Sequence, residues 1–299
     1  MCAKIIFVGN YKGGVGKTTS VLNFAEYFSR KRDCSVLVLD LDPQSSLSEI
    51  LVSKGNYGTL ADLKEQETLN YVFDLNISKI ERYPSLDIQF DDSMLVKSFS
   101  GYHFIPSSLF YQNNMGLDAL ALRMKDNIQH LSILKSFVDT MRNNYDYIFV
   151  DCPPANNLIT RSAFLMSDYY VIPTVLDGLS TKGVLHYIDT IVGTYQKYCI
   201  EHEDALIARH FFGEEPKLLG IFYNMIRGQV NYDVAKSDFE SSLKERKYGK
   251  DVILNKQINN YIDIARKTQN GEVSIEKDDF LVLADELLLR IHTDLANRV

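Results

Sequence analysis

Short apolar runs rich in β-branched and aromatic residues alternate along the chain with longer segments in which apolar residues recur at helical spacing. This alternation is typical of a mostly parallel β-sheet flanked by helices, with right-handed crossovers. We expect strands over residues 5–8, 36–39, 147–150, 170–172 and 218–223, and a weaker one over 102–105. We expect helices over residues 17–29, 128–142, 158–166, 181–198 and 234–247. The pattern therefore predicts a doubly wound α/β fold.

Residues 56–100 are harder to interpret, because acidic, aromatic and serine-containing stretches alternate there without a sustained period. We expect a peripheral insertion with short helices. No linker rich in Pro, Gly or Ser divides the 299 residues, a length near the upper limit for one hydrophobic core. We predict a single domain over residues 1–299, with this insertion and a helical C-terminal region over about residues 231–299.

The composition is that of an ordinary globular protein, with 45% apolar and 24% charged residues and a formal net charge of -7. A negative chain is not coated in positive charge for nucleic acid, although a local basic patch remains compatible with it. The four cysteines are scattered without a C-x-x-C pair, which disfavours both a disulfide framework and a cysteine metal site.

No stretch approaches the roughly 20 apolar residues needed to span a bilayer, and the first residues lack the features of a cleaved signal peptide. We therefore expect a cytoplasmic protein.

The run GNYKGGVGKTT, residues 9–19, follows the first expected strand and begins the first expected helix. This is the context of a phosphate-binding loop, in which glycines let several backbone N–H groups and the helix N-terminus face phosphate oxygens. Lys17 can reach the outer phosphates, and the Thr18 hydroxyl can bind Mg²⁺. The nucleotide contacts expected in this loop come from Lys12, Gly13, Gly14, Val15, Gly16, Lys17, Thr18 and Thr19.

The lysine at the entrance of this loop makes it more specific. KGGVGKT, residues 12–18, resembles the deviant Walker A box of the ParA/MinD family, in which the first lysine reaches across a dimer to the partner's nucleotide. The resemblance implies a P-loop ATPase that uses ATP and in which Lys12 and Lys17 are catalytic. Lys12 would neutralise charge on the transferred phosphoryl group, as an arginine finger does. The alternative is a solvated surface lysine.

Two carboxylates end the second expected strand in the run VLVLDLDPQ, residues 36–44. Asp40 and Asp42 should therefore emerge at the carboxyl edge of the sheet, where open α/β folds bind ligands. D-x-D-P-Q resembles the switch element of the family, which implies that Asp42 is catalytic and orients or activates the attacking water. By the same resemblance Asp40 would support Mg²⁺ and its hydration shell. Capping of the next helix is the alternative for either side chain.

A third carboxylate, Asp151, follows the expected strand at 147–150 and resembles the Walker B residue of the family. Mg²⁺ usually keeps several waters and binds one or two carboxylates plus phosphate, so Asp151 would hold it through water. The candidate metal residues are thus Thr18, Asp40 and Asp151.

Later strands extend the resemblance over nearly the whole chain. Asn224, after the expected strand at 218–223, is the candidate for adenine recognition because its amide offers a donor and an acceptor; a turn residue at the strand end is the alternative. Two departures from the family pattern are Tyr11, where glutamine is common, and Ser45-Ser46, which replaces Gly-Asn.

The resemblance implies a slow ATPase that forms a homodimer with Mg²⁺-ATP, binds DNA non-specifically, and is released when a ParB-like partner stimulates hydrolysis. Such proteins partition plasmids or chromosomes, which would place this one on the nucleoid. Phosphate contacts need Lys or Arg side chains. The main candidates are Arg227, Lys244, Arg246, Lys247, Lys250, Arg266 and Lys267. The alternative is solvated helix faces, since Asp238, Glu240 and Glu245 are interspersed.

Two other functional classes share the glycine-rich loop of this family. A MinD-like ATPase that positions cellular machinery on a membrane would need an amphipathic tail with a basic polar face, but the polar face of residues 278–291 is mainly acidic. We therefore expect a docked core helix there and no membrane partner. An ATP-driven carrier of iron–sulfur clusters would need paired cysteines, and the absence of a C-x-x-C pair disfavours this class.

Because the sequence begins at the first strand, we also expect no helix-turn-helix domain before it.

Overall fold

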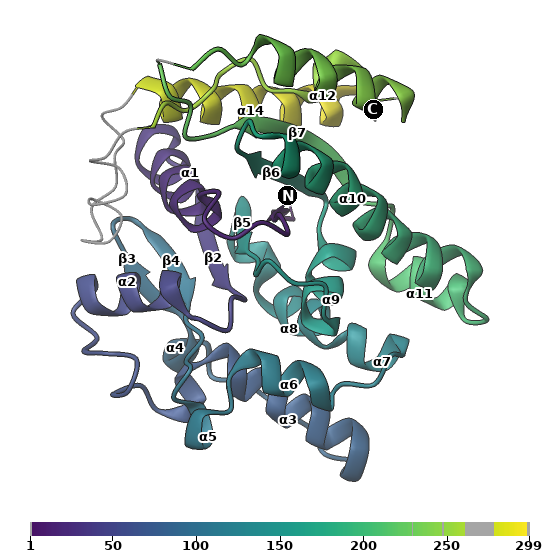
Figure 1. Ribbon diagram of the computed structural model, residues 1–299. Coiled ribbons are helices and arrows are strands. Elements are labelled where there is room, and N and C mark those ends of the chain that lie inside the picture. The colour runs from purple at the N-terminus through teal and green to yellow at the C-terminus, as the bar shows by residue number, and fades with distance from the viewer. Residues whose placement is uncertain (1, 229, 247, 261–277, 298–299) are drawn as a thin grey trace.

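The computed structural model describes residues 2–228, 230–246, 248–260 and 278–297. Its centre is a seven-stranded sheet of order β3-β4-β2-β5-β1-β6-β7 (Figure 1). All neighbouring strands in the sheet are parallel except β3 and β4, which pair antiparallel. The strands are β1 (Lys4–Val8), β2 (Val36–Asp40), β3 (Lys97–Phe99), β4 (Tyr102–Ile105), β5 (Tyr147–Asp151), β6 (Tyr169–Thr174) and β7 (Lys217–Tyr223). The predicted doubly wound, mostly parallel α/β fold is confirmed.

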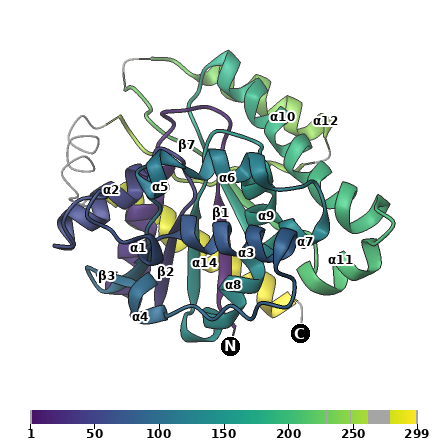
Figure 2. The ribbon, with the colours of Figure 1, turned by 90° about the horizontal axis from the view of Figure 1, so that it is seen from below.

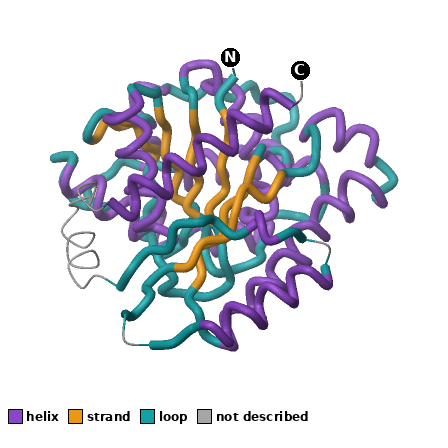
Figure 3. The backbone as a smooth tube through the Cα atoms, turned by 90° about the horizontal axis from the view of Figure 1, so that it is seen from above, coloured by secondary structure: helices purple, strands orange, loops and turns teal. Residues whose placement is uncertain are grey.

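Both faces of the sheet are covered by helices (Figure 3). In β1, Ile5 and Phe7 belong to one buried cluster, whereas Ile6 and Val8 belong to the other. This alternation follows from the two-residue period of a strand, and because both faces are dry the strand reads as one continuous apolar run.

One face of the sheet is covered by α1 (Lys17–Arg32), α2 (Ser46–Lys54) and α14 (Asp278–Asn297). The tail helix α14 packs Leu283, Leu287 and Ile291 into this face, all fully buried. Its apolar stripe is therefore part of the core, as expected for a docked helix. Within the described part of the chain, no helix is both long enough and apolar enough to cross a bilayer.

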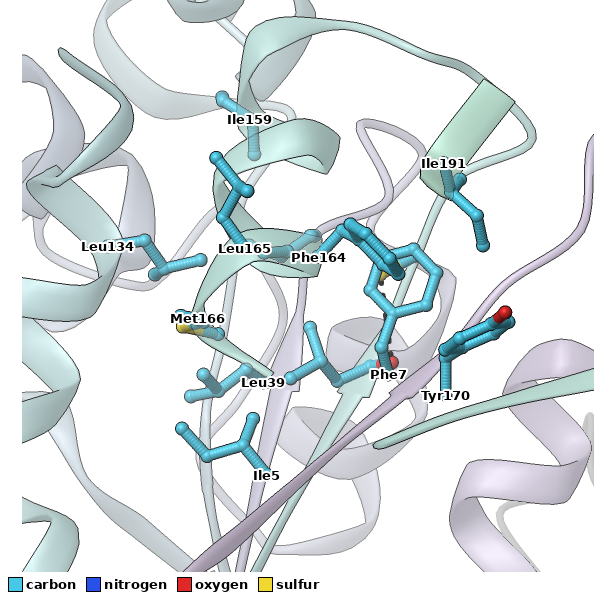
Figure 4. Packing of buried hydrophobic residues seen from close by; sticks show 14 of the residues in the cluster. Ile5, Phe7, Leu39, Leu134, Ile159, Phe164, Leu165, Met166, Tyr170 and Ile191 are labelled. Carbon is cyan, nitrogen blue, oxygen red and sulfur yellow. Dashed lines mark hydrogen bonds between the residues drawn. The ribbon is translucent and has the colours of Figure 1, made fainter. Parts of the chain in front are cut away.

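The helices on the other face form a second layer, seen together in Figure 2. They are α3 (Leu69–Arg82), α6 (Leu117–Arg123), α7 (Ile128–Leu131), α8 (Ile133–Met141), α9 (Leu158–Met166), α10 (Gly178–Tyr195), α11 (Ala205–Phe212) and α12 (Asp233–Glu245). Figure 4 shows how α9 packs over the strands: the ring of Phe164 meets the ring of Phe7 edge-on, with centroids 5.9 Å apart. This contact supports the strand from which the glycine-rich loop departs.

Shorter helical segments connect these elements. They are η1 (Glu65–Glu67), α4 (Asp92–Leu95), α5 (Tyr111–Asn114), η2 (Arg142–Asn144), the π-helical η3 (Gln196–Glu201) and η4 (Lys250–Val252). The helix expected over 128–142 is divided between α7 and α8 at Ser132, whose hydroxyl donates to the carbonyl of Gln129. A side chain that bonds its own backbone in this way competes with the helix.

Residues 56–100, for which the sequence shows no sustained period, contribute to the core. Within residues 56–100, α3 is 14 residues long and buries Leu69, Val72, Phe73 and Ile77, so the region holds more than the short helices we expected. These four residues do follow helical spacing. The same segment supplies β3, the antiparallel edge strand, which was not predicted because three residues carry no measurable period.

Candidate functional site

Three loops meet at the carboxyl edge of the sheet because their strands are neighbours. Asp151 at the end of β5 lies opposite Val8 of β1 on one side and opposite Asp40 of β2 on the other. The glycine-rich loop, which follows β1, therefore begins beside Asp151, and Asp40 lies on the far side of Asp151. This edge is where ligands bind in open α/β sheets.

The glycine-rich loop needs glycine at its last turn. Gly14 and Gly16 have φ of 71° and 87°, in the left-handed region. A Cβ atom on Gly16 would lie 2.3 Å from Nδ2 of Asn224, so no other residue fits there without a shift. No acidic residue occupies the first turn of α1, and its N-terminus can therefore face an anion.

Lys17 is the first residue of α1 and is only 7% exposed. Its Nζ donates to the carbonyl of Lys12 across the loop, at 3.1 Å. Burial lowers the pKa of Lys17, while the nearby charges of Asp151 and Asp42 raise it. A cation held inside the loop in this way is suited to phosphate oxygens.

The side-chain oxygens of Thr18 and Asp151 lie together at the start of α1. The Thr18 hydroxyl donates to Oδ2 of Asp151 at 2.6 Å, and Asp151 is 1% exposed. Its other oxygen, Oδ1, is buried and has no hydrogen-bond partner in the described structure. Burial and the charge of Asp40 raise the pKa of Asp151 well above its ordinary value. A buried carboxylate oxygen without a partner beside a hydroxyl fits Mg²⁺, which takes hard oxygen ligands.

Asp40 caps the next helix, which was the alternative left open by the sequence. Its Oδ2 accepts from the backbone N–H of Ser48, the third residue of α2, at 2.8 Å. Its Oδ1 accepts from the backbone N–H of Asp42 at 3.1 Å. Burial raises the pKa of Asp40 to about 6, although the bonds from Ser48 act in the opposite direction. Its part in magnesium binding stays a prediction.

Asp42 lies nearer to solvent than Asp40. It is half-buried, and its Oδ1 accepts from the backbone N–H of Gln44 at 2.9 Å in the turn before α2. Asp42 is thus partly accessible to solvent, and its role in orienting the attacking water stays a prediction.

Lys12 is held by a group that sequence reasoning missed. Its Nζ lies 2.7 Å from Oδ2 of Asp177 and 2.6 Å from Oγ of Ser180, both at the start of α10. Burial would raise the pKa of Asp177, but the hydrogen bonds from Lys12 and Ser180 lower it to about 2. The two residues are 165 and 168 positions from Lys12. They meet it because β1 and β6 are neighbours, which the sequence pattern does not reveal.

Asn224 and Tyr11 hold the loop from two sides. The amide Nδ2 of Asn224 donates to the carbonyl of Val15 at 2.8 Å. Tyr11 packs edge-on against Tyr187 of α10, with ring centroids 4.7 Å apart. In this arrangement Asn224 fixes the backbone of the loop, and adenine recognition by the same residue stays a prediction.

Among the described residues, the DNA-binding candidates lie at the two ends of α12. Arg227 is exposed before α12, whereas Lys244 and Arg246 are exposed at its other end. A helix of the 13 residues of α12 is about 20 Å long, which separates the two groups. Arg246 also pairs with Asp189 at 3.2 Å. Lys247, Arg266 and Lys267 lie outside the described residues, as does the side chain of Lys250.

Comparison with known proteins finds one matching family and several relatives. The sequence model of a family described as an AAA domain matches residues 3–202. The sporulation initiation inhibitor protein Soj of Bacillus subtilis is 27% identical over 191 residues, which are 63% of this chain and 64% of Soj. The ParA family protein pGP5-D, from a virulence plasmid of Chlamydia psittaci, is 22% identical over 293 residues, covering 95% of this chain and 94% of the relative.

Solved structures share the fold. A complex of a McdA variant from Cyanothece with ATP has a TM-score of 0.70 at 17% identity, covering 97% of this chain and 96% of McdA. The alignments with the first curated relatives span only 62%, 62% and 64% of those proteins. The chain therefore matches about three fifths of the length of these relatives.

Proposed function

We propose that this chain, which belongs to the ParA family of P-loop ATPases, binds Mg²⁺-ATP, dimerises around the nucleotide and hydrolyses it slowly. The observation that carries the proposal is the meeting of Lys12, Lys17, Thr18, Asp42 and Asp151 at one edge of the sheet, around the N-terminus of α1.

The phosphate groups of ATP would lie on the glycine-rich loop. Backbone N–H groups of residues 13–19 and the free N-terminus of α1 would bind their oxygens, and Lys17 would exchange its bond to the Lys12 carbonyl for one to the outer phosphates. Thr18 and Asp151 would hold Mg²⁺, with Asp40 behind them. Bound Mg²⁺ supplies charge neutralisation on the phosphate oxygens.

Hydrolysis would use one group from each subunit of a homodimer. Asp42 would orient or activate the attacking water, and Lys12 of the other subunit would neutralise charge on the transferred phosphoryl group. For that role Lys12 must leave Asp177 of its own chain. The proposal is therefore that dimer formation exchanges a carboxylate partner of Lys12 for a phosphate.

The ATP-bound dimer would bind DNA without sequence preference in the cytoplasm, on the nucleoid, and a ParB-like partner would stimulate hydrolysis and release it. This is the chemistry of a partition ATPase, and the ParA family protein of a Chlamydia psittaci plasmid aligns over nearly the whole chain. Among the candidates predicted from the sequence, Arg227, Lys244 and Arg246 are described and exposed, and they could contact phosphate in such a complex.

The alternative is a MinD-like ATPase that positions machinery on a membrane or another cellular surface. It is supported less well, because the apolar residues of α14 that would enter a membrane are buried in the core.

Nucleotide-dependent DNA binding tests the proposal. Binding of a random duplex is measured with ATP, with ADP and without nucleotide, at several salt concentrations. We expect binding only with ATP and an affinity that falls steeply as salt rises, because phosphate contacts release counterions. Vesicles containing anionic lipid form the second arm. Binding to vesicles with ATP, together with no DNA binding in any nucleotide state, would replace partition by the positioning function.

A further inference from the structure

A chain of buried hydroxyl groups leads from Asp40 to the loop after β4. The Ser48 hydroxyl donates to Oδ2 of Asp40 at 2.6 Å, beside the 2.8 Å bond from the Ser48 backbone. Since a serine hydroxyl has one hydrogen, its oxygen is left to accept, and the backbone N–H of Ser107 donates to it at 2.8 Å. The Ser107 hydroxyl lies 3.0 Å from that of Ser45. All four residues are no more than 2% exposed, so water does not compete for these bonds.

The far end of this chain is anchored by α3. Asn70, fully buried, accepts from the backbone N–H of Ser108 at 2.9 Å and donates to the Ser108 carbonyl at 3.0 Å. Its amide also donates to the carbonyl of Met115 at 3.2 Å. One side chain thus fixes the backbone of Ser108, the residue directly after Ser107, and ties it to Met115. The segment without a clear sequence period therefore supplies the support for this loop.

The near end of the chain reaches the Asp42 turn. The second oxygen of Asp40, Oδ1, accepts from the backbone N–H of Asp42 at 3.1 Å. A rotation of the Asp40 carboxylate would therefore disturb the start of α2 and the turn that carries Asp42 at the same time. None of the hydrogen bonds named in this network involves the glycine-rich loop. Phosphate binding by the loop should therefore not depend on them.

We propose that Ser48, held in place by Ser107 and Asn70, is a positioning residue: it fixes the Asp40 carboxylate beside Asp151 and, through it, the turn that carries Asp42. This inference rests on the proposed ATPase function. The same network includes Ser45, one of the two residues that differ from the Gly-Asn of the family pattern, because its hydroxyl lies beside that of Ser107.

A double-mutant cycle separates positioning from general damage. Ser48→Ala and Asp40→Ala are made singly and together, and the Mg²⁺ concentration that half-saturates binding of a fluorescent ADP analogue is measured for each. We expect Ser48→Ala to raise this concentration about fivefold in the parent and less than about twofold in the Asp40→Ala background, because its partner is then absent. In the parent, Ser48→Ala should lower kcat about tenfold and change KM for ATP less than about twofold.

Three variants complete the design. Ser53→Ala removes a hydroxyl from the exposed side of α2 and should behave as the parent. Ser48→Thr keeps the hydroxyl and should restore most of kcat. Ser48→Cys keeps nearly the same side-chain volume but replaces the hydroxyl with a thiol, a much weaker hydrogen-bond donor. It takes the place of Ser48→Ala in the double-mutant cycle if Ser48→Ala does not fold.

The outcomes distinguish this inference from the proposed function. An equal effect of the Ser48 substitution in both backgrounds would overturn the positioning role while parent turnover remained normal. A parent protein that binds no Mg²⁺-nucleotide would overturn the ATPase proposal itself.

Discussion

The ammonium group of Lys12 lies 2.7 Å from Oδ2 of Asp177 in the same chain. The family resemblance assigns Lys12 to the nucleotide of the partner subunit, but here Lys12 is paired with Asp177 of its own chain, at the start of α10. The Lys12 and Asp177 side chains are 44% and 46% exposed. An ion pair with this much exposure to water contributes about 1 kcal/mol or less to stability. A phosphate group can therefore replace Asp177 at small cost.

Loosening this pair should favour the dimer. Asp177→Asn removes the charge that competes for Lys12, and we expect ATP-dependent dimerisation at a protein concentration about threefold to fivefold lower than for the parent. Sedimentation velocity with a non-hydrolysable ATP analogue measures this shift. Asp189→Asn removes an exposed charge from the same helix and should leave the concentration unchanged. A dimer weakened by Asp177→Asn would show that the acid supports the interface instead.

Lys17 should be indispensable for nucleotide binding. Lys17→Ala removes the buried cation of the glycine-rich loop, and we expect the affinity for ATP to fall at least about a hundredfold, because charge-assisted bonds to phosphate are lost in a desolvated site. Isothermal titration calorimetry measures this. Lys31→Ala, at the exposed end of α1, is the matched control. Affinity within threefold of the parent would remove Lys17 from the site.

Asp42 should matter for turnover and not for binding. Asp42→Ala is expected to bind ATP and dimerise as the parent does, while kcat falls at least about a hundredfold, because the group that orients the attacking water is gone. Phosphate release and sedimentation with ATP are followed in parallel. Asp87→Ala, on an exposed loop, controls for loss of an acid. Turnover at the parent rate would exclude Asp42 from the reaction.

The buried carboxylates should make the stability of the nucleotide-free protein depend on pH. Burial raises the pKa of Asp40 to about 6 and that of Asp151 well above its usual range. A carboxyl group with a raised pKa binds more protons in the folded chain than in the unfolded chain, so stability should fall as pH rises from about 4 through about 6. Asp151→Asn removes one of these charges.

Thermal unfolding at two pH values checks this sign. At pH 8 with EDTA, we expect Asp151→Asn to melt about 2 °C above the parent, roughly the effect of 1 kcal/mol. At pH 5 the difference should shrink, because burial raises the pKa of Asp151 and lower pH favours its uncharged form. An advantage of the same size at both pH values would mean that ionisation of Asp151 is not its cause.

The local motifs of the site could be predicted from the sequence, whereas its long-range partners could not. The glycine-rich loop and Asp151 each follow an apolar run directly, and neighbouring parallel strands then bring them together. Asp177 is 165 residues from Lys12, and only the strand order, with β6 beside β1, brings the two into contact. Pattern alone carries no information about that order.

The fold shows the same division. Strands buried on both faces were predicted because parallel sheets give continuous apolar runs. The helix α3 was missed although Leu69, Val72 and Phe73 have helical spacing, since polar and aromatic neighbours on both sides obscured the period. The cap that Asp40 provides for α2 stayed one of two interpretations, because the same carboxylate can bond a helix end or a metal shell.

Mixing two inactive variants tests most directly whether Lys12 acts across the dimer. Lys12→Ala and Asp42→Ala are each expected to lack ATPase activity. In a mixed dimer, the Lys12→Ala subunit keeps its own Asp42 and receives Lys12 from its partner, so one site of two is complete. We expect an equal mixture to recover up to about a quarter of the parent turnover, since about half of the dimers are mixed and half of their sites are intact. A mixture no more active than its components would contradict the trans role of Lys12.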